Sequence, residues 1–139
     1  MNFVVDSLMA LAWVLKDETT AETDKILDSL GQGAKAFVPA LWRWEMANGL
    51  LTVEKRKRAT RTEVNGHFLR LGSLPIEIDE PASDQAWTVT HALAQKHSLT
   101  SYDAAYLELA IRRGLPLATL DSDLAAAAKL QKVDVLPAK

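Results

Sequence analysis

The sequence predicts an α/β fold, a three-layer α/β/α sandwich with a central, mainly parallel sheet of four to five strands. Short strand-like segments alternate with helical segments along the chain, and this alternation is typical of a parallel sheet covered by helices on both faces. The chain has 139 residues, is 48% apolar and contains no cysteine, which suits one domain with a hydrophobic core and no disulfides. We therefore expect a single domain over residues 1–139.

The expected strands are short, apolar and rich in β-branched residues. The first reads NFVV, and the third, PIEI, is the weakest candidate. Polar residues, glycine or proline bound each segment, as is typical of strands. In order, the expected strands cover residues 2–5, 35–38, 75–78, 116–120 and 133–136.

The helices are predicted from apolar residues at helical spacing. In the longest helix, Trp42, Met46, Leu50 and Val53 follow this spacing. A proline at position 81 is expected to open another helix, because proline fits the first turn. The expected helices cover residues 8–15, 19–30, 40–56, 60–71 and 81–96, then a helix with Asp103 in its first turn, and residues 124–130.

Charge and hydropathy limit the classes of function. The longest apolar run, residues 8–15, is too short to span a bilayer and lacks the preceding basic segment of a signal peptide. We therefore expect a cytoplasmic protein with no membrane contact. A net charge of −2 does not indicate nucleic-acid binding, yet five cations cluster locally: Lys55, Arg56, Lys57, Arg58 and Arg61. They suit a solvated helix C-terminus or an RNA-backbone contact.

Acidic residues occur where strands give way to helices. Asp6 follows the first strand, Asp121 follows the fourth, and Asp103 and Asp123 fall in or near first turns of helices. Each has a simpler explanation as a helix cap or as a complement to the helix dipole. However, sites in parallel sheets form at the carboxyl ends of the strands. The sequence therefore predicts that Asp6 and Asp121 meet at one edge of the sheet.

Glu45 is harder to explain as a structural residue, because it lies in the middle of a helix and can cap nothing. Its neighbours are Trp44 and Met46. A buried carboxylate without a partner is costly. A surface ion pair with Arg43 or Lys25 is the simpler alternative to a functional role.

The acids are more informative together than singly. Two carboxylates about 4 Å apart repel each other by roughly 4 kcal/mol at an intermediate dielectric, so four of them need protons or a cation. None of the three histidines stands near an acid at a spacing typical of zinc ligands. Carboxylate oxygens suit Mg²⁺, with Mn²⁺ as a substitute. Such an ion supports phosphodiester hydrolysis by orienting the phosphate and activating water.

Three segments resemble a known family: VVDS at residues 4–7, WEMANGL at residues 44–50, and LTSYDAAYLELAIRRGLPLATLDSDL at residues 99–124. With these segments and the distances between them, the chain resembles the PIN-domain ribonucleases, and most closely the VapC-type toxins of type II toxin–antitoxin modules. The resemblance covers essentially the whole chain, and residues 99–124 are its most specific part. It implies a PIN-like version of the predicted sandwich.

The resemblance assigns roles to individual residues. Asp6 and Asp103 match the acids that bind the metal most directly, while Glu45 and Asp121 match acids that act through water or a second ion. Further matches are Asp123, an additional acid of some members, and the hydroxyl positions Ser7 and Thr119.

The resemblance also implies a function and partners. A Mg²⁺-dependent endoribonuclease toxin would hydrolyse transfer or ribosomal RNA, inhibit translation and be neutralised by a cognate VapB-type antitoxin over the acidic cleft. A homodimer is implied as well. The apolar Trp13, Trp42 and Trp44 would contribute to antitoxin docking or, alternatively, pack in the core.

Two other classes of function fit the acids less well. One is a catalytically silent module that uses its acidic cleft to bind a protein. The other is a phosphoryl-accepting, receiver-like domain, which needs paired acids after the first strand and an aspartate after the third; Asp6 stands alone and Asp79 is poorly placed. A haloacid-dehalogenase-type phosphatase is suggested only by Asp121-Ser122-Asp123, where Ala125 replaces the expected threonine.

Overall fold

The fold is built on a five-stranded sheet. The computed structural model describes residues 1–138. The strands are β1 (Phe3–Val5), β2 (Ala36–Val38), β3 (Ile76–Ile78), β4 (Leu117–Ala118) and β5 (Val135–Leu136). All four pairings are parallel, in the spatial order β3-β2-β1-β4-β5. The predicted sandwich and its parallel sheet are therefore confirmed.

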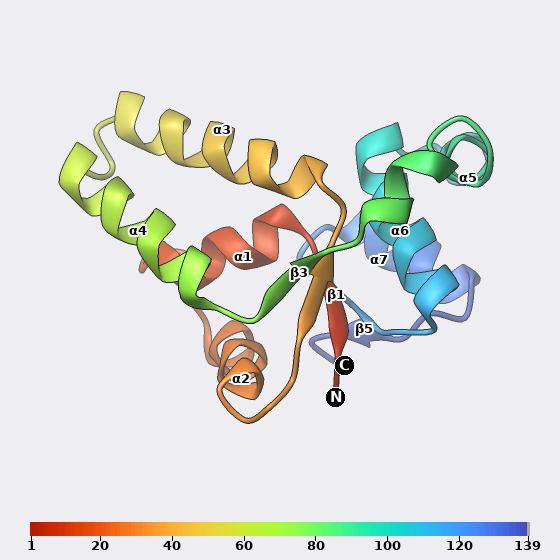
Figure 1. Ribbon diagram of the computed structural model, residues 1–139, viewed down its shortest axis with the longest axis horizontal. Helices are drawn as coiled ribbons and strands as arrows, with labels where there is room; N and C mark the ends of the chain where they lie inside the picture. Colours follow the sequence, from red (N-terminus) through yellow and green to blue (C-terminus); the bar gives the residue numbers. More distant parts are fainter. Residues whose placement is uncertain (139) are drawn as a thin grey trace.

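Helices cover both faces of this sheet (Figure 1). One face carries α1 (Ser7–Val14), α2 (Ala21–Leu30), α3 (Leu41–Lys55) and α4 (Arg61–Ser73), and the other carries α5 (Val89–His97), α6 (Ser101–Arg113) and α7 (Ser122–Leu130). The strand order explains this division, because the chain moves from β1 towards β3 in its first half and from β4 towards β5 in its second. The direction reverses between β1 and β4, the place where parallel sheets form sites.

Local sequence sets the helix ends close to the predicted positions. Thr60 caps α4 by accepting the Glu63 backbone N–H at 3.1 Å, and the Glu63 carboxylate accepts the Thr60 N–H at 2.9 Å. This reciprocal capping box satisfies two donors that would otherwise lack partners. Helix α6 ends at Gly114, which adopts a left-handed conformation with φ of +64°. Glycine is favoured there because it has no Cβ to clash.

The continuous helix predicted over residues 81–96 is wrong. The segment forms a 3-10 helix, η1 (Glu80–Gln85), and then breaks before α5. The prediction used Trp87 and Val89 as part of an apolar stripe, but Trp87 is 95% exposed and Val89 is also exposed. The buried residues of this segment are instead Ala82, Thr90 and Leu93. Sequence periodicity therefore assigned the wrong face to the core.

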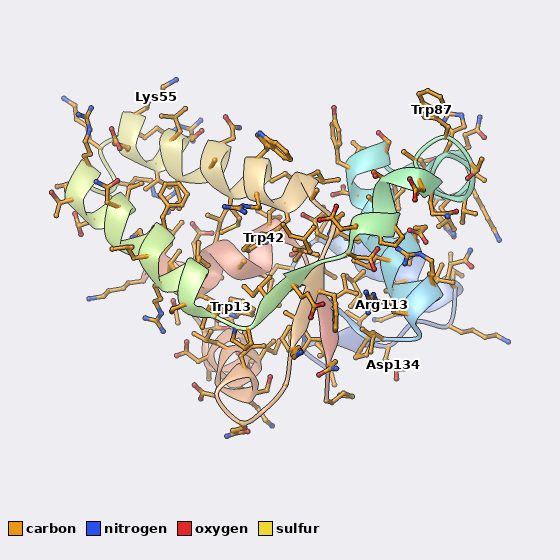
Figure 2. The ribbon with its side chains drawn as sticks, viewed as in Figure 1. Trp13, Trp42, Lys55, Trp87, Arg113 and Asp134 are labelled. Carbon is orange, nitrogen blue, oxygen red and sulfur yellow. The ribbon has the colours of Figure 1, made fainter. Side chains whose placement is uncertain are left out.

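The hydrophobic core takes up two of the three tryptophans considered for partner docking. Trp13 and Trp42 are buried, and the Trp13 indole N–H donates to the Thr23 carbonyl at 3.1 Å. Figure 2 places both side chains within the helical layer around α1. Core packing is therefore their role, while Trp44 is 70% exposed and remains available for contact.

Close packing fixes the position of α3 against α1. Gly49 lies beside Leu11, and a Cβ built on Gly49 would stand only 2.9 Å from a Leu11 methyl carbon. A larger residue at this position would push the two helices apart. Glu45 lies one helical turn before Gly49 on the same helix.

A buried ion-pair network fixes α6 to the far edge of the sheet. The Asp79 carboxylate, just after β3, accepts from the Arg112 guanidinium at 2.5 Å and from Arg113 Nε at 2.7 Å. Arg112 also pairs with Glu108 at 2.7 Å, and the Arg113 guanidinium lies 4.2 Å from the centre of the Phe37 ring. This network holds the C-terminal half of the helix whose first turn carries Asp103.

The helices of residues 1–138 are at most 15 residues long. None of them combines the length and the apolar character that crossing a bilayer needs.

Candidate metal centre

The reversal point between β1 and β4 holds the first group of predicted site residues. Asp6 follows β1 and is 5% exposed, and Asp121 follows β4. Thr119 joins them: its hydroxyl donates to Asp6 Oδ2 and accepts the Asp121 backbone N–H at 3.0 Å. A single buried hydroxyl therefore fixes both acids relative to each other.

Asp6 and Asp121 also cap helices, as their simpler explanation proposed. Asp6 Oδ1 accepts the Met9 backbone N–H at 2.9 Å, and Asp121 Oδ1 accepts the Leu124 backbone N–H at 2.9 Å. Capping uses one oxygen of each carboxylate. Structural and functional roles are thus compatible, because a carboxylate retains further acceptor capacity.

Glu45 enters the same region from α3. Its Oε1 accepts a hydrogen bond from the buried Tyr106 hydroxyl at 2.5 Å, across the gap between α3 and α6. The surface ion pair with Arg43 or Lys25 does not form in the structure. Burial first, and then Glu45, raise the pKa of Tyr106, so the phenol stays protonated and acts as a fixed donor.

Tyr106 is a site residue that sequence reasoning missed. It lies three residues after Asp103 in α6, so the two side chains occupy one helix face. That spacing was the available signal, but the residue resembled an ordinary core aromatic. Its partner is 61 residues away in the chain, and no local pattern links such distant positions.

The remaining predicted residues lie around this centre. Asp103 occupies the first turn of α6 and is half-buried, whereas Asp123 is exposed in the first turn of α7. Ser7, the first residue of α1, is half-buried next to Asp6. The structure therefore brings Asp6, Glu45 and Asp103 together with Asp121 and leaves Asp123 at the rim.

Electrostatics show how closely the acids interact. Burial is the main cause that raises the pKa of Asp6 to about 6; hydrogen bonds from Thr119 and Met9 oppose it, and the charges of Asp103 and Asp121 add to it. Burial, followed by the charge of Asp121, also raises the pKa of Asp103. For Glu45, burial raises the pKa against the Tyr106 hydrogen bond, and Asp103 raises it further.

These acids have no basic partner. Within residues 1–138, no lysine, arginine or histidine forms an ion pair with Asp6, Glu45, Asp103 or Asp121. The basic cluster does not supply one: Lys55 lies at the outer end of α3 in Figure 2, about 15 Å along the helix from Glu45. Arg58 is paired with Asp17 at 2.7 Å and Glu18 at 2.9 Å.

The chemistry of this donor set fits a hard divalent cation. All four groups are carboxylates, which Mg²⁺ and Mn²⁺ prefer. Within residues 1–138, no three acids or histidines converge on one point as a ready-made cage. Mg²⁺ fits such a site, because it commonly uses one or two carboxylates and keeps several waters. The charges of Asp103 and Asp121 both raise the pKa of Asp6, so these carboxylates lie close enough to share such an ion.

Comparison with known proteins agrees with this fold. The family model described as "PIN domain" matches residues 3–130. Ribonuclease VapC1 of Mycobacterium tuberculosis is 32% identical over 121 residues, which cover 80% of this chain and 91% of that protein.

Two solved structures share the architecture. The crystal structure of PAE2754 from Pyrobaculum aerophilum has a TM-score of 0.70 at 24% identity, covering 98% of this chain and 84% of that chain. The crystal structure of VapBC2 from Rickettsia felis, which is bound to a DNA fragment from the VapBC2 promoter, has a TM-score of 0.66 at 13% identity and 97% coverage of both chains. These structures share the fold, and the matched family model shows the family: the chain belongs to the PIN domain family, with a VapC ribonuclease among its relatives.

Proposed function

We propose that residues 1–139 form a single PIN domain that acts as a Mg²⁺-dependent endoribonuclease. The observation that carries this proposal is the group of four carboxylates at the β1–β4 reversal point, which have no basic partner within residues 1–138. Such a group is costly to keep unless a cation binds it. The relationship to Ribonuclease VapC1 favours RNA as the substrate.

Each acid has a distinct task in this proposal. Asp6 and Asp103 would hold the ion, which when bound would orient the scissile phosphate, offset developing negative charge and make water more acidic. Glu45 would accept the proton of the attacking water, and its raised pKa suits a general base. Asp121 would orient solvent at the other side of the site. Thr119 and Tyr106 would keep Asp6 and Glu45 in place.

The biological role that we propose is that of a toxin. Cleavage of transfer or ribosomal RNA would inhibit translation, and a cognate VapB-type antitoxin would cover the acidic centre. VapBC2 provides a neighbour of the same fold. The exposed Trp44, one residue before Glu45, is a suitable apolar contact for that partner. We also propose a homodimer, to be tested by sedimentation analysis.

The function is tested by incubating total cellular RNA with purified protein that carries no bound partner. We expect discrete fragments with Mg²⁺ or Mn²⁺, none with EDTA, and none with Asp6→Asn or Asp103→Asn. The matched control is Lys96→Gln, an exposed change on α5, which should cleave like the wild type.

Failure of the wild type to cleave RNA under these conditions would contradict the proposal. The acidic cleft would then be better explained as a protein-binding surface. A receiver-like role is disfavoured in either case, because Asp79, the acid that follows β3, is bonded to Arg112 and Arg113 rather than open to a phosphoryl group.

A further inference from the structure

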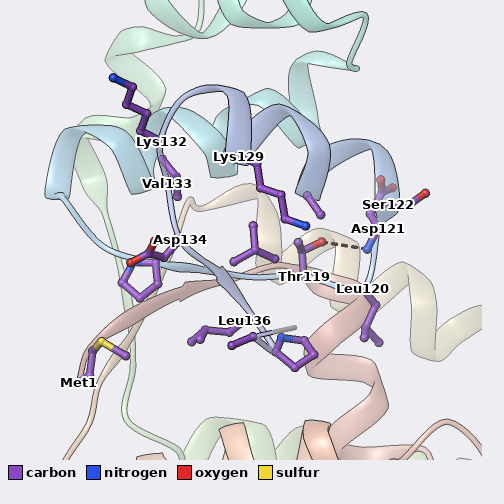
Figure 3. Close-up of a pocket in the computed structure, with 15 residues that line it drawn as sticks. Met1, Thr119, Leu120, Asp121, Ser122, Lys129, Lys132, Val133, Asp134 and Leu136 are labelled. Atoms are coloured by element: carbon purple, nitrogen blue, oxygen red, sulfur yellow. Dashed lines mark hydrogen bonds between the residues drawn. The ribbon is translucent and has the colours of Figure 1, made fainter.

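A pocket of about 690 Å³ adjoins the carboxylates on the side of β5. It lies between α7 and the last two strands, and it shares Thr119 and Asp121 with the site (Figure 3). Its volume is in the range of pockets that hold small molecules. The pocket is therefore a continuation of the acidic centre.

The wall of this pocket carries an unpaired cation. Lys129, in the last turn of α7, extends in Figure 3 towards Thr119, whereas Lys132 points away from the centre of the pocket. Within residues 1–138, Lys129 forms no ion pair. An exposed lysine without an acidic partner is free to bind an anion beside the metal centre.

The other polar residues of the wall are Thr119, Asp121, Ser122, Lys132 and Asp134, and the remaining lining residues are apolar. Leu120, Val133 and Leu136 line the pocket together with Pro137, and Leu120 is partly exposed. Apolar surface of this kind accepts the face of an unstacked base or a ribose, which a duplex would not present. The combination of Lys129, which extends towards the site, with this apolar surface matches a nucleotide of a single strand.

The Lys129 ammonium also offsets the repulsion between RNA and the carboxylates of the site. A polyanion that approaches four carboxylates is repelled, and one divalent ion offsets only part of their charge. Lysine contacts to phosphates are a main source of affinity for nucleic acids. The basic cluster around Lys55 is about 15 Å from Glu45 along α3, whereas Lys129 lines the same pocket as Asp121.

We propose that this pocket binds the nucleotide of single-stranded RNA that adjoins the scissile phosphodiester, with the Lys129 ammonium paired to its phosphate. The proposal rests on the ribonuclease function proposed above and specifies where the substrate lies. It assigns Lys129 to substrate binding, not to the chemical step.

The test measures binding apart from cleavage. In the cleavage-silent Asp103→Asn background, fluorescence anisotropy follows a labelled single-stranded RNA of mixed sequence across a range of salt concentrations. Lys129→Gln should weaken binding by about threefold to tenfold and reduce the slope of log K against log salt by about 0.7. Lys129→Arg should retain the affinity. The control Lys96→Gln, also in the last turn of a helix, should match the parent protein.

The outcomes separate this inference from the proposed function. If the wild type cleaves RNA but Lys129→Gln binds with unchanged affinity and salt slope, the pocket assignment is overturned and the nuclease stands. If binding depends on Lys129 but the wild type never cleaves, the pocket still binds RNA, whereas the nuclease and the place of the pocket beside a scissile bond are overturned. An unchanged RNA affinity together with loss of a co-purifying protein would assign the pocket to that partner and overturn the RNA proposal.

Discussion

Two groups of buried acids lie at carboxyl ends of strands in this sheet, and their surroundings are opposite. Asp79, after β3, is fully buried and is bonded to the guanidinium groups of Arg112 and Arg113. Asp6, after β1, is almost as buried, but its partners are a hydroxyl and a backbone N–H, with further carboxylates close by.

The pKa values follow this difference. Burial alone would raise the pKa of Asp79, but hydrogen bonds from Arg112 and Arg113 outweigh burial and lower it. For Asp6, burial prevails and the pKa rises to about 6. An acid that is bonded to arginines, such as Asp79, is compensated and stabilises the fold. An acid without a paired cation, such as Asp6, is uncompensated and destabilises the fold, which suits a role in binding a cation. The contrast separates a structural acid from a functional one on the same sheet.

The largest expected effect on stability comes from changing Asp79, the compensated acid. Asp79→Asn should lower the free energy of unfolding by roughly 3 kcal/mol, the lower end for breaking a buried ion pair, because both arginine side chains keep some contact with solvent. Urea unfolding measures this. The matched control is Glu77→Gln on β3, two residues before Asp79. Its pair with Lys35 is exposed and 3.8 Å long, so this change should affect stability little.

Acid should remove the Asp79 contribution selectively. Because the folded pKa of Asp79 is lower than the unfolded value of about 3.9, the unfolded chain binds more protons near that pH, and stability rises with pH. The contribution is complete above about pH 4 and disappears as the pH falls through the folded pKa. The difference in free energy of unfolding between wild type and Asp79→Asn should therefore become smaller on acidification. A stability difference that stays constant down to pH 2 would contradict an ionic role for Asp79.

At Asp6, the uncompensated acid, removing the charge should raise the free energy of unfolding instead of lowering it. In EDTA at pH 7.5, Asp6→Asn should raise the free energy of unfolding by about 1–2 kcal/mol, given that one pKa unit corresponds to about 1.4 kcal/mol. Asparagine still caps α1, so the charge is the main change. Destabilisation of the metal-free protein by Asp6→Asn would erase the distinction between the two groups of acids.

The sequence could predict one of these groups and not the other. Asp6 and Asp121 follow recognisable strands, and the parallel topology brings the ends of such strands together. The Asp79 network joins residue 79 to residues 112–113, and nothing local in the sequence connects them. The same limit applies to the Tyr106–Glu45 bond. Alternating strands and helices thus predict the fold and the position of Asp6 and Asp121, whereas tertiary contacts select their partners.

The break between η1 and α5 has a different cause. Residues 81–96 have helical spacing of apolar residues, but spacing alone does not say which apolar residues become buried. Trp87 points to solvent, while Thr90 is buried. An exposed tryptophan contradicts the usual correlation between hydrophobicity and burial, and the prediction failed at that residue.

A third variant tests whether a hydroxyl donor holds Glu45 in position, in the way that the arginines hold Asp79. Tyr106→Phe removes the donor to Glu45 while leaving the buried ring. We expect cleavage to fall about tenfold to 100-fold, as for other groups that orient the residues around a bound metal, with a higher Mg²⁺ requirement. Tyr102→Phe, an exposed tyrosine one turn earlier, is the control. Loss of stability without a change in Mg²⁺ requirement would reduce Tyr106 to a packing residue.

The smallest expected effect comes from a guanidinium–carboxylate pair at the surface. Arg58 contacts Asp17 and Glu18 at distances similar to those of the Asp79 network, and it links the end of α3 to the loop before α2. Here water screens the charges, and exposed pairs contribute little. Arg58→Gln should therefore leave both the urea midpoint and RNA cleavage unchanged within error. A midpoint shift as large as that of Asp79→Asn would mean that burial does not govern the strength of these pairs, and the comparison between the two groups of acids would then need another physical basis.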